Sequence, residues 1–199
     1  MSSLHMTLGT PLNGPWPPNT RTISFGMGCF WGAEKKFWPL PGVVCTSVGY
    51  QGGDFENPDY RTVCGGRTGH AEVVQIAYDP ARITLYDLLK VFWENHDPTQ
   101  GNRQGNDIGS QYRGAVFYDD PADAALITTT RDAYARELDK RGFGAITTEI
   151  AWAADPADPL TFWLAEDSHQ QYLAKNPNGY DCHAHTGIDL PPMESSAGA

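Results

Sequence analysis

A cysteine at position 29 stands in the segment GCFWGAE, directly after Gly28 and before two large aromatic residues, Phe30 and Trp31. Residues 21–28 are strand-like and end in glycine, so we expect a helix to begin at Cys29. The first turn of a helix has unpaired N–H groups and the positive end of the helix dipole, which favour thiolate over thiol. The segment therefore predicts a nucleophile beside an apolar wall. The alternative is that the cysteine and both rings are packing residues at a strand-to-helix corner, although the glycine is expected to leave room around the sulfur.

A candidate proton donor follows in residues 70–78, HAEVVQIAY, which are predicted to form a strand. Alternation along this strand places Glu72 on the same face as His70, Val74 and Ile76. A carboxyl group on an apolar face is expected to have a raised pKa, so it could donate a proton at neutral pH. The alternative is a carboxylate in water at the end of the strand.

Further polar groups lie within or next to two turn-rich segments, residues 51–69 and 95–111. Long loops inside a compact domain are usually functional or disordered. Tyr60, Asp107 and Tyr112 could converge on one site with the cysteine. Taken singly, each of these residues also has a structural or solvent-exposed interpretation.

The elements that would position these residues follow the order β-α-β-β-α-β, then helix, strand and helix. This order predicts an α+β fold with a ferredoxin-like split βαβ core, a mixed or antiparallel sheet, extra helices and a long C-terminal coil. Thr84 and Asp87 form a capping box at the start of the second helix. The expected strands cover residues 21–28, 43–50, 70–78, 112–120 and 145–153, and the helices begin at Cys29, Thr84, Pro121 and Asp158.

Length and composition predict one catalytic domain at residues 21–183, between an N-terminal arm (1–20) and a C-terminal tail (184–199). The chain has 199 residues, 40% of them hydrophobic, which is enough for one sizeable core. Its opening lacks the pattern of a secretion signal, and no apolar run approaches the roughly 20 residues that span a bilayer. The net charge of -10 argues against nucleic acid or an anionic membrane as a partner.

The four cysteines form no CxxC motif, and a cytoplasmic location would keep them reduced, so any disulfide is expected to be transient and catalytic. Cys45 lies in a β-branched run and is predicted to be a buried, inert thiol. Cys64 lies in a glycine-rich loop, from which it could approach the site, and is interpreted mainly as structural. Cys182 lies in the C-terminal coil, from which it could approach within the roughly 7 Å that a disulfide requires. The motif CHAH lacks a second pair of ligands at zinc-finger spacing, so no metal site is predicted.

Five blocks of sequence occur together: GCFWGAE, SVGYQGG, NPDYRTVCGGRTGHAEVV, VFWENHDPTQGNRQGNDIGSQYR and AEDSHQQYLAKNPNGYDC. In this order they resemble the A-type peptide methionine sulfoxide reductases over residues 21–183. The resemblance implies that Cys29 attacks the sulfoxide sulfur, that Phe30 and Trp31 form the wall for the substrate methyl group, and that Glu72 protonates the sulfoxide oxygen. It implies hydrogen-bonding or supporting roles for three more residues: Tyr60, Tyr112 and Asp107.

The resemblance also implies how the cysteine is recycled. The S epimer of methionine sulfoxide, free or in oxidised proteins that need repair, would leave a sulfenic acid on Cys29. Cys182 would then form a Cys29–Cys182 disulfide, which an external dithiol such as thioredoxin reduces, with no bound cofactor. The chain departs from some relatives because no further cysteine follows Cys182, and GYDCHAH differs from the common glycine-rich tail. We expect a monomer.

Two other classes of protein remain as alternatives. A cysteine hydrolase would use Cys29 with a histidine base and would not need Cys182. A redox-sensing thiol module would form the Cys29–Cys182 disulfide under peroxide without reducing any sulfoxide. The presence of the whole set around Cys29 argues against both.

Overall fold

The computed structural model describes residues 3–155, 160–181 and 184–193 of the chain. Its centre is a six-stranded sheet with the order β7-β6-β1-β3-β2-β8. The strands β1, β3, β2 and β6 pair antiparallel, and β7 runs parallel to β6. The strands of this sheet are β1 (Arg21–Met27), β2 (Val43–Gln51), β3 (Ala71–Tyr78), β6 (Gly114–Tyr118), β7 (Glu149–Trp152) and β8 (Trp163–Leu164). A separate two-stranded ribbon joins β4 (Arg103–Gln104) to β5 (Asp107–Ile108).

Two helices connect the central strands in the split βαβ manner. Helix α1 (Phe30–Phe37) links β1 to β2, and α3 (Leu85–Glu94) lies between β3 and β6 along the chain. With the strand order β6-β1-β3-β2, this connectivity is the ferredoxin-like arrangement. The α+β fold predicted from the sequence is therefore confirmed.

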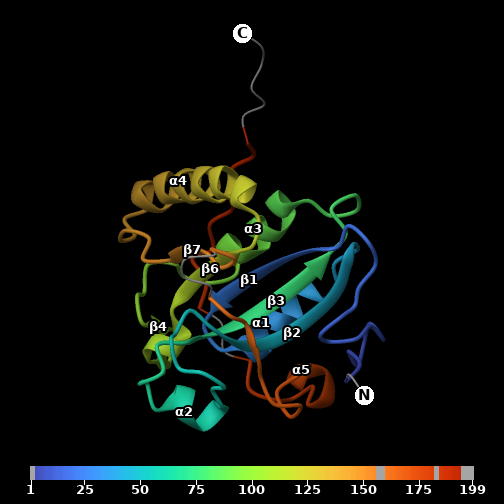
Figure 1. The fold of residues 1–199 in the computed structure, drawn as a ribbon. Coiled ribbons are helices and arrows are strands. Elements are labelled where there is room, and N and C mark those ends of the chain that lie inside the picture. Colours follow the sequence, from blue (N-terminus) through green and yellow to red (C-terminus); the bar gives the residue numbers. More distant parts are fainter. Residues whose placement is uncertain (1–2, 156–159, 182–183, 194–199) are drawn as a thin grey trace.

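The main hydrophobic core lies between the sheet and the helices. Side chains of β1, β3 and β6 pack there against α1 and α3, and α4 (Ala124–Lys140) packs against α3 (Figure 1). Helix α3 begins with the capping box of Thr84 and Asp87 that its sequence predicts. No helix within the described ranges combines the length and apolarity needed to cross a membrane.

The N-terminal residues lie alongside strand β2. The Thr10 hydroxyl donates to the Val44 carbonyl oxygen (2.8 Å), and Leu12 packs in a buried cluster with Cys45. The Nε2 atom of His5 lies 2.8 Å from the hydroxyl oxygen of Thr46. Cys45 is 1% exposed, so the prediction of a buried thiol at this position is confirmed.

The prediction of a last helix from Asp158 is wrong. Where a helix was expected from Asp158, the described residues form strand β8 and, further on, the four-residue helix α5 (Tyr172–Lys175). Gly49 of β2 permits this strand: the Trp163 carbonyl oxygen lies 2.3 Å from where a Cβ would be, and β8 pairs there. Two further boundaries differ, because β7 covers only the end of its predicted strand and α2 (Tyr60–Cys64) forms inside a predicted loop.

Candidate active site

The predicted site residues line one small cavity of about 170 Å³. They come from the start of α1, from α2, β3 and β5, and from the short 3-10 helix η1 (Ser110–Tyr112). The fold thus brings Cys29 together with Tyr112, which lies 83 positions further along the chain, and the two turn-rich segments converge on the cysteine as predicted. The lining residues are Cys29, Phe30, Trp31, Tyr60, Glu72, Asp107, Tyr112 and Tyr180. Cys182, the predicted resolving cysteine, lies outside the described residues.

Cys29 caps the N-terminus of α1 and is 8% exposed. The turn before it depends on Gly28, whose φ of +88° is a conformation that favours glycine. A Cβ at this position would also lie 2.6 Å from the Gln104 side chain. Gln104 fills the space beside Gly28 itself, so a larger residue does not fit there. The glycine is needed for the chain reversal that brings Cys29 to the helix start.

Glu72 lies beside the cysteine on β3 and is 1% exposed. Its Oε2 accepts a hydrogen bond from the backbone N–H of Phe30 (3.1 Å), the residue that follows Cys29. The pKa of Glu72 is raised to about 8, mainly by burial and to a smaller extent by the nearby Asp107, whereas the hydrogen bond from the Phe30 N–H acts in the opposite direction. Near neutral pH, this carboxyl group therefore holds a proton that it can donate into the cavity.

The two phenols of the cavity remain protonated as well. Burial is the main cause that raises the pKa of both Tyr60 and Tyr112, and the Glu72 carboxyl raises both further. Tyr60 opens α2, and its backbone N–H donates to Glu166 (2.8 Å). Tyr112 is the last residue of η1 and follows Glu72 in the sequence, whereas Tyr60 precedes it. The cavity therefore offers hydroxyl donors in addition to the carboxyl group.

Two side chains of the C-terminal segment, His169 and Tyr172, contact the indole of Trp31. Its Nε1 donates to Nδ1 of His169 (3.1 Å), and its ring stacks on Tyr172 with 3.8 Å between centroids. Phe30 contacts the same histidine, with 5.4 Å between ring centroids. The apolar wall next to Cys29 is therefore a packed aromatic cluster.

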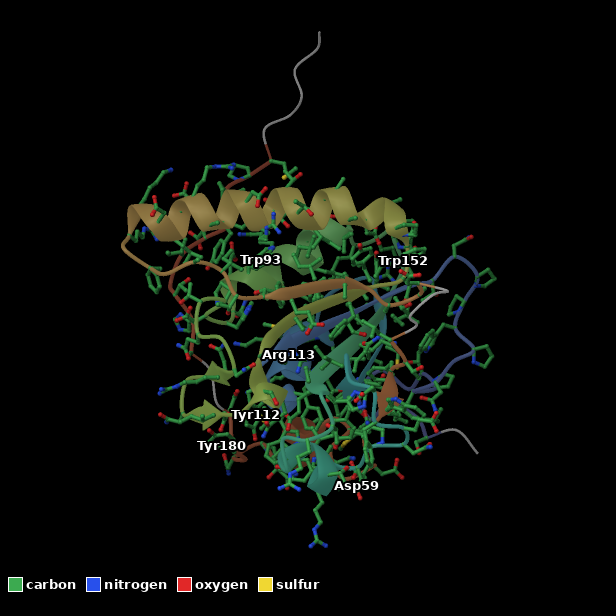
Figure 2. The ribbon with its side chains drawn as sticks, turned by 60° about the vertical axis from the view of Figure 1, so that its left-hand side comes forward. Asp59, Trp93, Tyr112, Arg113, Trp152 and Tyr180 are labelled. Atoms are coloured by element: carbon green, nitrogen blue, oxygen red, sulfur yellow. The ribbon has the colours of Figure 1, made fainter. Side chains whose placement is uncertain are left out.

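Tyr180 is a member of the cavity that the sequence did not indicate. Its hydroxyl donates to Oδ1 of Asp107 (3.0 Å), and it lies on the same side of the molecule as Tyr112 (Figure 2). Oδ2 of Asp107 is buried and has no hydrogen-bond partner among the described residues. A single tyrosine in a coil, 73 positions from Asp107, gives no pattern from which its place could be read.

The remaining described thiols differ in access: Cys45 is buried and Cys64 is exposed on α2. Within the described ranges, no group of three or more His, Cys, Asp or Glu side chains is placed to hold a metal ion. His183 and Cys182 of the CHAH motif fall outside those ranges. The chemistry available in the cavity is that of a thiol, a protonated carboxyl group and phenols.

A family model described as peptide methionine sulfoxide reductase matches residues 21–196. The peptide methionine sulfoxide reductase MsrA of Salinispora arenicola is 56% identical over 189 residues, which cover 94% of this chain and 83% of that protein. The chain belongs to the peptide methionine sulfoxide reductase family. The family and enzyme class predicted from the sequence blocks are therefore confirmed.

Solved structures of this reductase family share the fold. Methionine sulfoxide reductase A of Corynebacterium diphtheriae has a TM-score of 0.82 and 47% identity, over 96% of this chain and 91% of that one. Reduced Mxr1 from Saccharomyces cerevisiae has a TM-score of 0.72 and 35% identity, over 85% of this chain and 94% of that one.

Proposed function

We propose that the cavity reduces the S epimer of methionine sulfoxide, with Cys29 as nucleophile and Glu72 as proton donor. The observation that carries this proposal is the place of the Glu72 carboxyl group, which is buried, lines the cavity and is bonded to the N–H of the residue after Cys29. Burial raises its pKa to about 8, which favours the protonated form. A sulfoxide oxygen leaves sulfur only when the charge that develops on it is neutralised. A protonated carboxyl group and two phenols supply that neutralisation in the cavity.

In the first step, the Cys29 thiolate attacks the sulfoxide sulfur while Glu72 gives its proton to the oxygen. The attack joins the two sulfur atoms. The protonated oxygen then passes to the Cys29 sulfur while the S–O bond of the substrate and the new sulfur–sulfur bond both break, which leaves a sulfenic acid on Cys29 and releases the substrate as a thioether. Tyr60 and Tyr112 hydrogen-bond the oxygen during the transfer, and Asp107 supports the site through its bond with Tyr180. Phe30 and Trp31 contact the methyl group of the substrate, because an apolar wall suits a methyl group better than a charged one.

In the second step, the thiol of Cys182 attacks the sulfenic acid, which forms the Cys29–Cys182 disulfide and releases water. A dithiol reductant then exchanges with this disulfide and restores both thiols. Thioredoxin fits this role, because it is a dithiol that is kept reduced in the cytoplasm, where we place the enzyme. Yeast Mxr1 has also been solved in complex with Trx2, which is a property of that protein. We assign no bound cofactor, and we propose that the enzyme acts as a monomer on free and protein-bound methionine sulfoxide.

The hydrolase alternative is less well supported by the cavity. Hydrolysis through Cys29 needs a histidine base within reach of the thiol. The described residues that line the cavity include no histidine. His169 lies behind the wall, where its Nδ1 accepts from the Trp31 indole, and burial lowers its pKa.

The test is reduction of the separated S and R epimers of a methionine sulfoxide peptide with dithiothreitol, by the wild type and by Cys29→Ser. We expect the wild type to reduce only the S epimer and Cys29→Ser to reduce neither. A Cys29–Cys182 disulfide that forms under peroxide without any sulfoxide turnover would favour the redox-sensing alternative. Reduction of the R epimer at a similar rate would contradict the proposed stereochemistry.

A further inference from the structure

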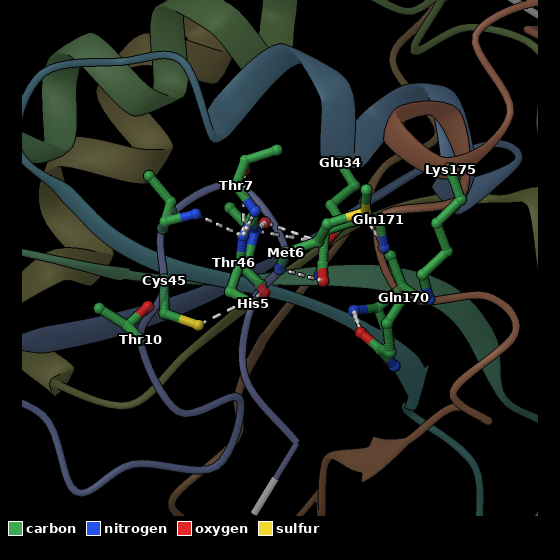
Figure 3. A network of polar contacts seen from close by, with 12 residues as sticks. His5, Met6, Thr7, Thr10, Glu34, Cys45, Thr46, Gln170, Gln171 and Lys175 are labelled. Atoms are coloured by element: carbon green, nitrogen blue, oxygen red, sulfur yellow. Dashed lines mark hydrogen bonds and ion pairs between the residues drawn. The ribbon is translucent and has the colours of Figure 1, made fainter.

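Glu34 is a second buried carboxyl group, one that the chemistry proposed above does not use. It lies on α1 and is 0% exposed. Its oxygens accept three hydrogen bonds: from the Thr46 hydroxyl (2.9 Å), and from the side-chain Nε2 (2.7 Å) and backbone N–H (2.8 Å) of Gln171 (Figure 3). A carboxylate is an acceptor only, so it matches all three donors. These bonds connect α1 to strand β2 and to the segment before α5.

On the β2 side, the hydrogen bonds run in one direction, from His5 through Thr46 to Glu34. Nδ1 of His5 accepts from the backbone N–H groups of Thr7 (3.2 Å) and Leu8 (3.1 Å). The proton of a neutral His5 therefore lies on Nε2, which donates to the Thr46 hydroxyl, and that hydroxyl donates to Glu34. The Thr46 hydroxyl is thus committed as a donor, and Glu34 is the acceptor at the end of the chain of bonds.

Gln171 has an unusual backbone conformation that its contacts explain. Its φ of +47° and ψ of +42° lie in the left-handed region, which side chains other than glycine seldom adopt. Such a conformation persists only where the surroundings impose it. Here both the backbone and the side-chain N–H groups of Gln171 point to Glu34, and its Oε1 accepts from the backbone N–H of Met6 (3.1 Å).

Gln171 stands immediately before Tyr172 and two residues after His169, the two side chains that hold the Trp31 indole. The conformation at position 171 sets the direction in which these flanking residues point. On α1, Trp31 and Glu34 are three positions apart, so they are neighbours on the helix surface. The helix therefore contacts the same short segment at two adjacent points, once through the indole and once through the carboxylate.

We propose that Glu34 is a positioning residue for the substrate cavity: its hydrogen bonds to Gln171 hold His169 and Tyr172 against Trp31. The inference rests on the proposed role of Trp31 as the wall for the substrate methyl group. Glu34 is not among the residues that line the cavity, so it acts through Trp31. A loosened wall weakens binding of substrate and transition state alike, which raises KM and leaves kcat nearly unchanged.

The main test is Glu34→Gln. If the amide keeps its oxygen toward Thr46 and the Gln171 side chain, its NH₂ group faces the backbone N–H of Gln171, and two donors oppose each other. We expect KM for the S epimer of N-acetylmethionine sulfoxide to rise roughly three- to tenfold, with kcat within about twofold of the wild type. Without substrate, the ¹⁵N–¹H signal of the Trp31 indole, assigned with Trp31→Phe, should move away from its hydrogen-bonded position.

A matched pair of variants examines the backbone at position 171. Gln171→Ala and Gln171→Gly lose the same side-chain bonds, but only glycine adopts the left-handed conformation without steric cost. We expect Gln171→Ala to raise KM more than Gln171→Gly does. If Glu34→Gln fails to fold, this pair of variants still tests whether the conformation at position 171 positions Trp31. Glu137→Gln on α4, which makes the same substitution in an ion pair with Lys140, is the control and should match the wild type.

An unchanged KM and an unmoved Trp31 signal in folded Glu34→Gln would overturn the proposal. Equal KM values for Gln171→Ala and Gln171→Gly would also overturn it, because Glu34 would then not act through the backbone at position 171. Failure of the proposed function itself is recognised separately. In that case the wild type would not reduce sulfoxide at all, while the indole signal would still report whether Glu34 positions Trp31.

Discussion

Two buried glutamates, Glu72 and Glu34, show how the same side chain serves two purposes in one domain. Among the residues that the structure describes, Glu72 accepts one hydrogen bond, from the Phe30 N–H, and it lines the cavity. Glu34 accepts three hydrogen bonds and lies outside the cavity lining. Burial raises the pKa of Glu72 to about 8 and that of Glu34 to about 7, where hydrogen bonds from Gln171 and Thr46 act in the opposite direction.

The difference lies in how many donors surround each carboxyl group. A carboxylate with three donors has its acceptor capacity committed to the fold, so it is suited to fixing segments relative to one another. The pKa of both groups is raised by burial, but only Glu72 lines the cavity, so only Glu72 is placed to give a proton to a bound substrate. The same replacement, Glu→Gln, should therefore lower the reaction rate at position 72 and the stability at position 34.

The largest effect is expected for Glu72→Gln. The amide cannot supply an acidic proton to the sulfoxide oxygen, so the single-turnover rate of sulfenic acid formation should fall by about 100-fold. Stability should stay within about 1 kcal/mol of the wild type, because the amide oxygen can still accept from the Phe30 N–H. Rapid-quench measurement of methionine formation and urea unfolding would check the two parts. A rate close to that of the wild type would remove Glu72 from the acid role.

The next largest effect is expected for the stability of Glu34→Gln. Loss of one acceptor leaves a buried donor of Gln171 unsatisfied, which should lower the free energy of unfolding by about 2 kcal/mol. The rate of sulfenic acid formation at saturating substrate should remain near that of the wild type. Urea unfolding of both Glu→Gln variants side by side would measure the contrast. If Glu34→Gln proved as stable as Glu72→Gln, the distinction by number of donors would be wrong.

A smaller effect is expected for Tyr112→Phe. The single-turnover rate should fall by about tenfold, less than for the loss of a sole oxyanion donor, because Tyr60 still donates to the same oxygen. The double variant with Tyr60→Phe should lose more than either single variant. Equal rates for Tyr112→Phe and the wild type would place this phenol outside the reaction.

The central fold, Cys29 and Glu72 could be predicted from local signals in the sequence, whereas the roles of Tyr60, Tyr112 and Asp107 were expected from the resemblance to the family. Alternation placed Glu72 on the apolar face of β3, where it stands opposite Tyr50 of β2. The capping box of Thr84 fixed the start of α3. Glycine before Cys29 marked the turn that delivers the thiol to the start of α1.

The remainder could not be predicted because it depends on contacts distant in sequence. Phe162, His169 and Tyr172 have helical spacing, but they face separate targets: the ring of Phe162 lies against Gly49, and the other two pack on Trp31. The left-handed backbone of Gln171 interrupts any helix before α5. No local pattern announces these contacts, and the same holds for the bond between Tyr180 and Asp107.

The pH dependence of sulfenic acid formation in the wild type and in Glu72→Gln tests the central claim most directly. Glu72 acts in its protonated form, and its pKa is raised from 4.5 to about 8, so the wild-type single-turnover rate should fall as the pH rises through about 8. The variant has no such group, so this descending limb should be absent from its profile. A descending limb near pH 8 that persists in Glu72→Gln would contradict the assignment of Glu72 as the proton donor.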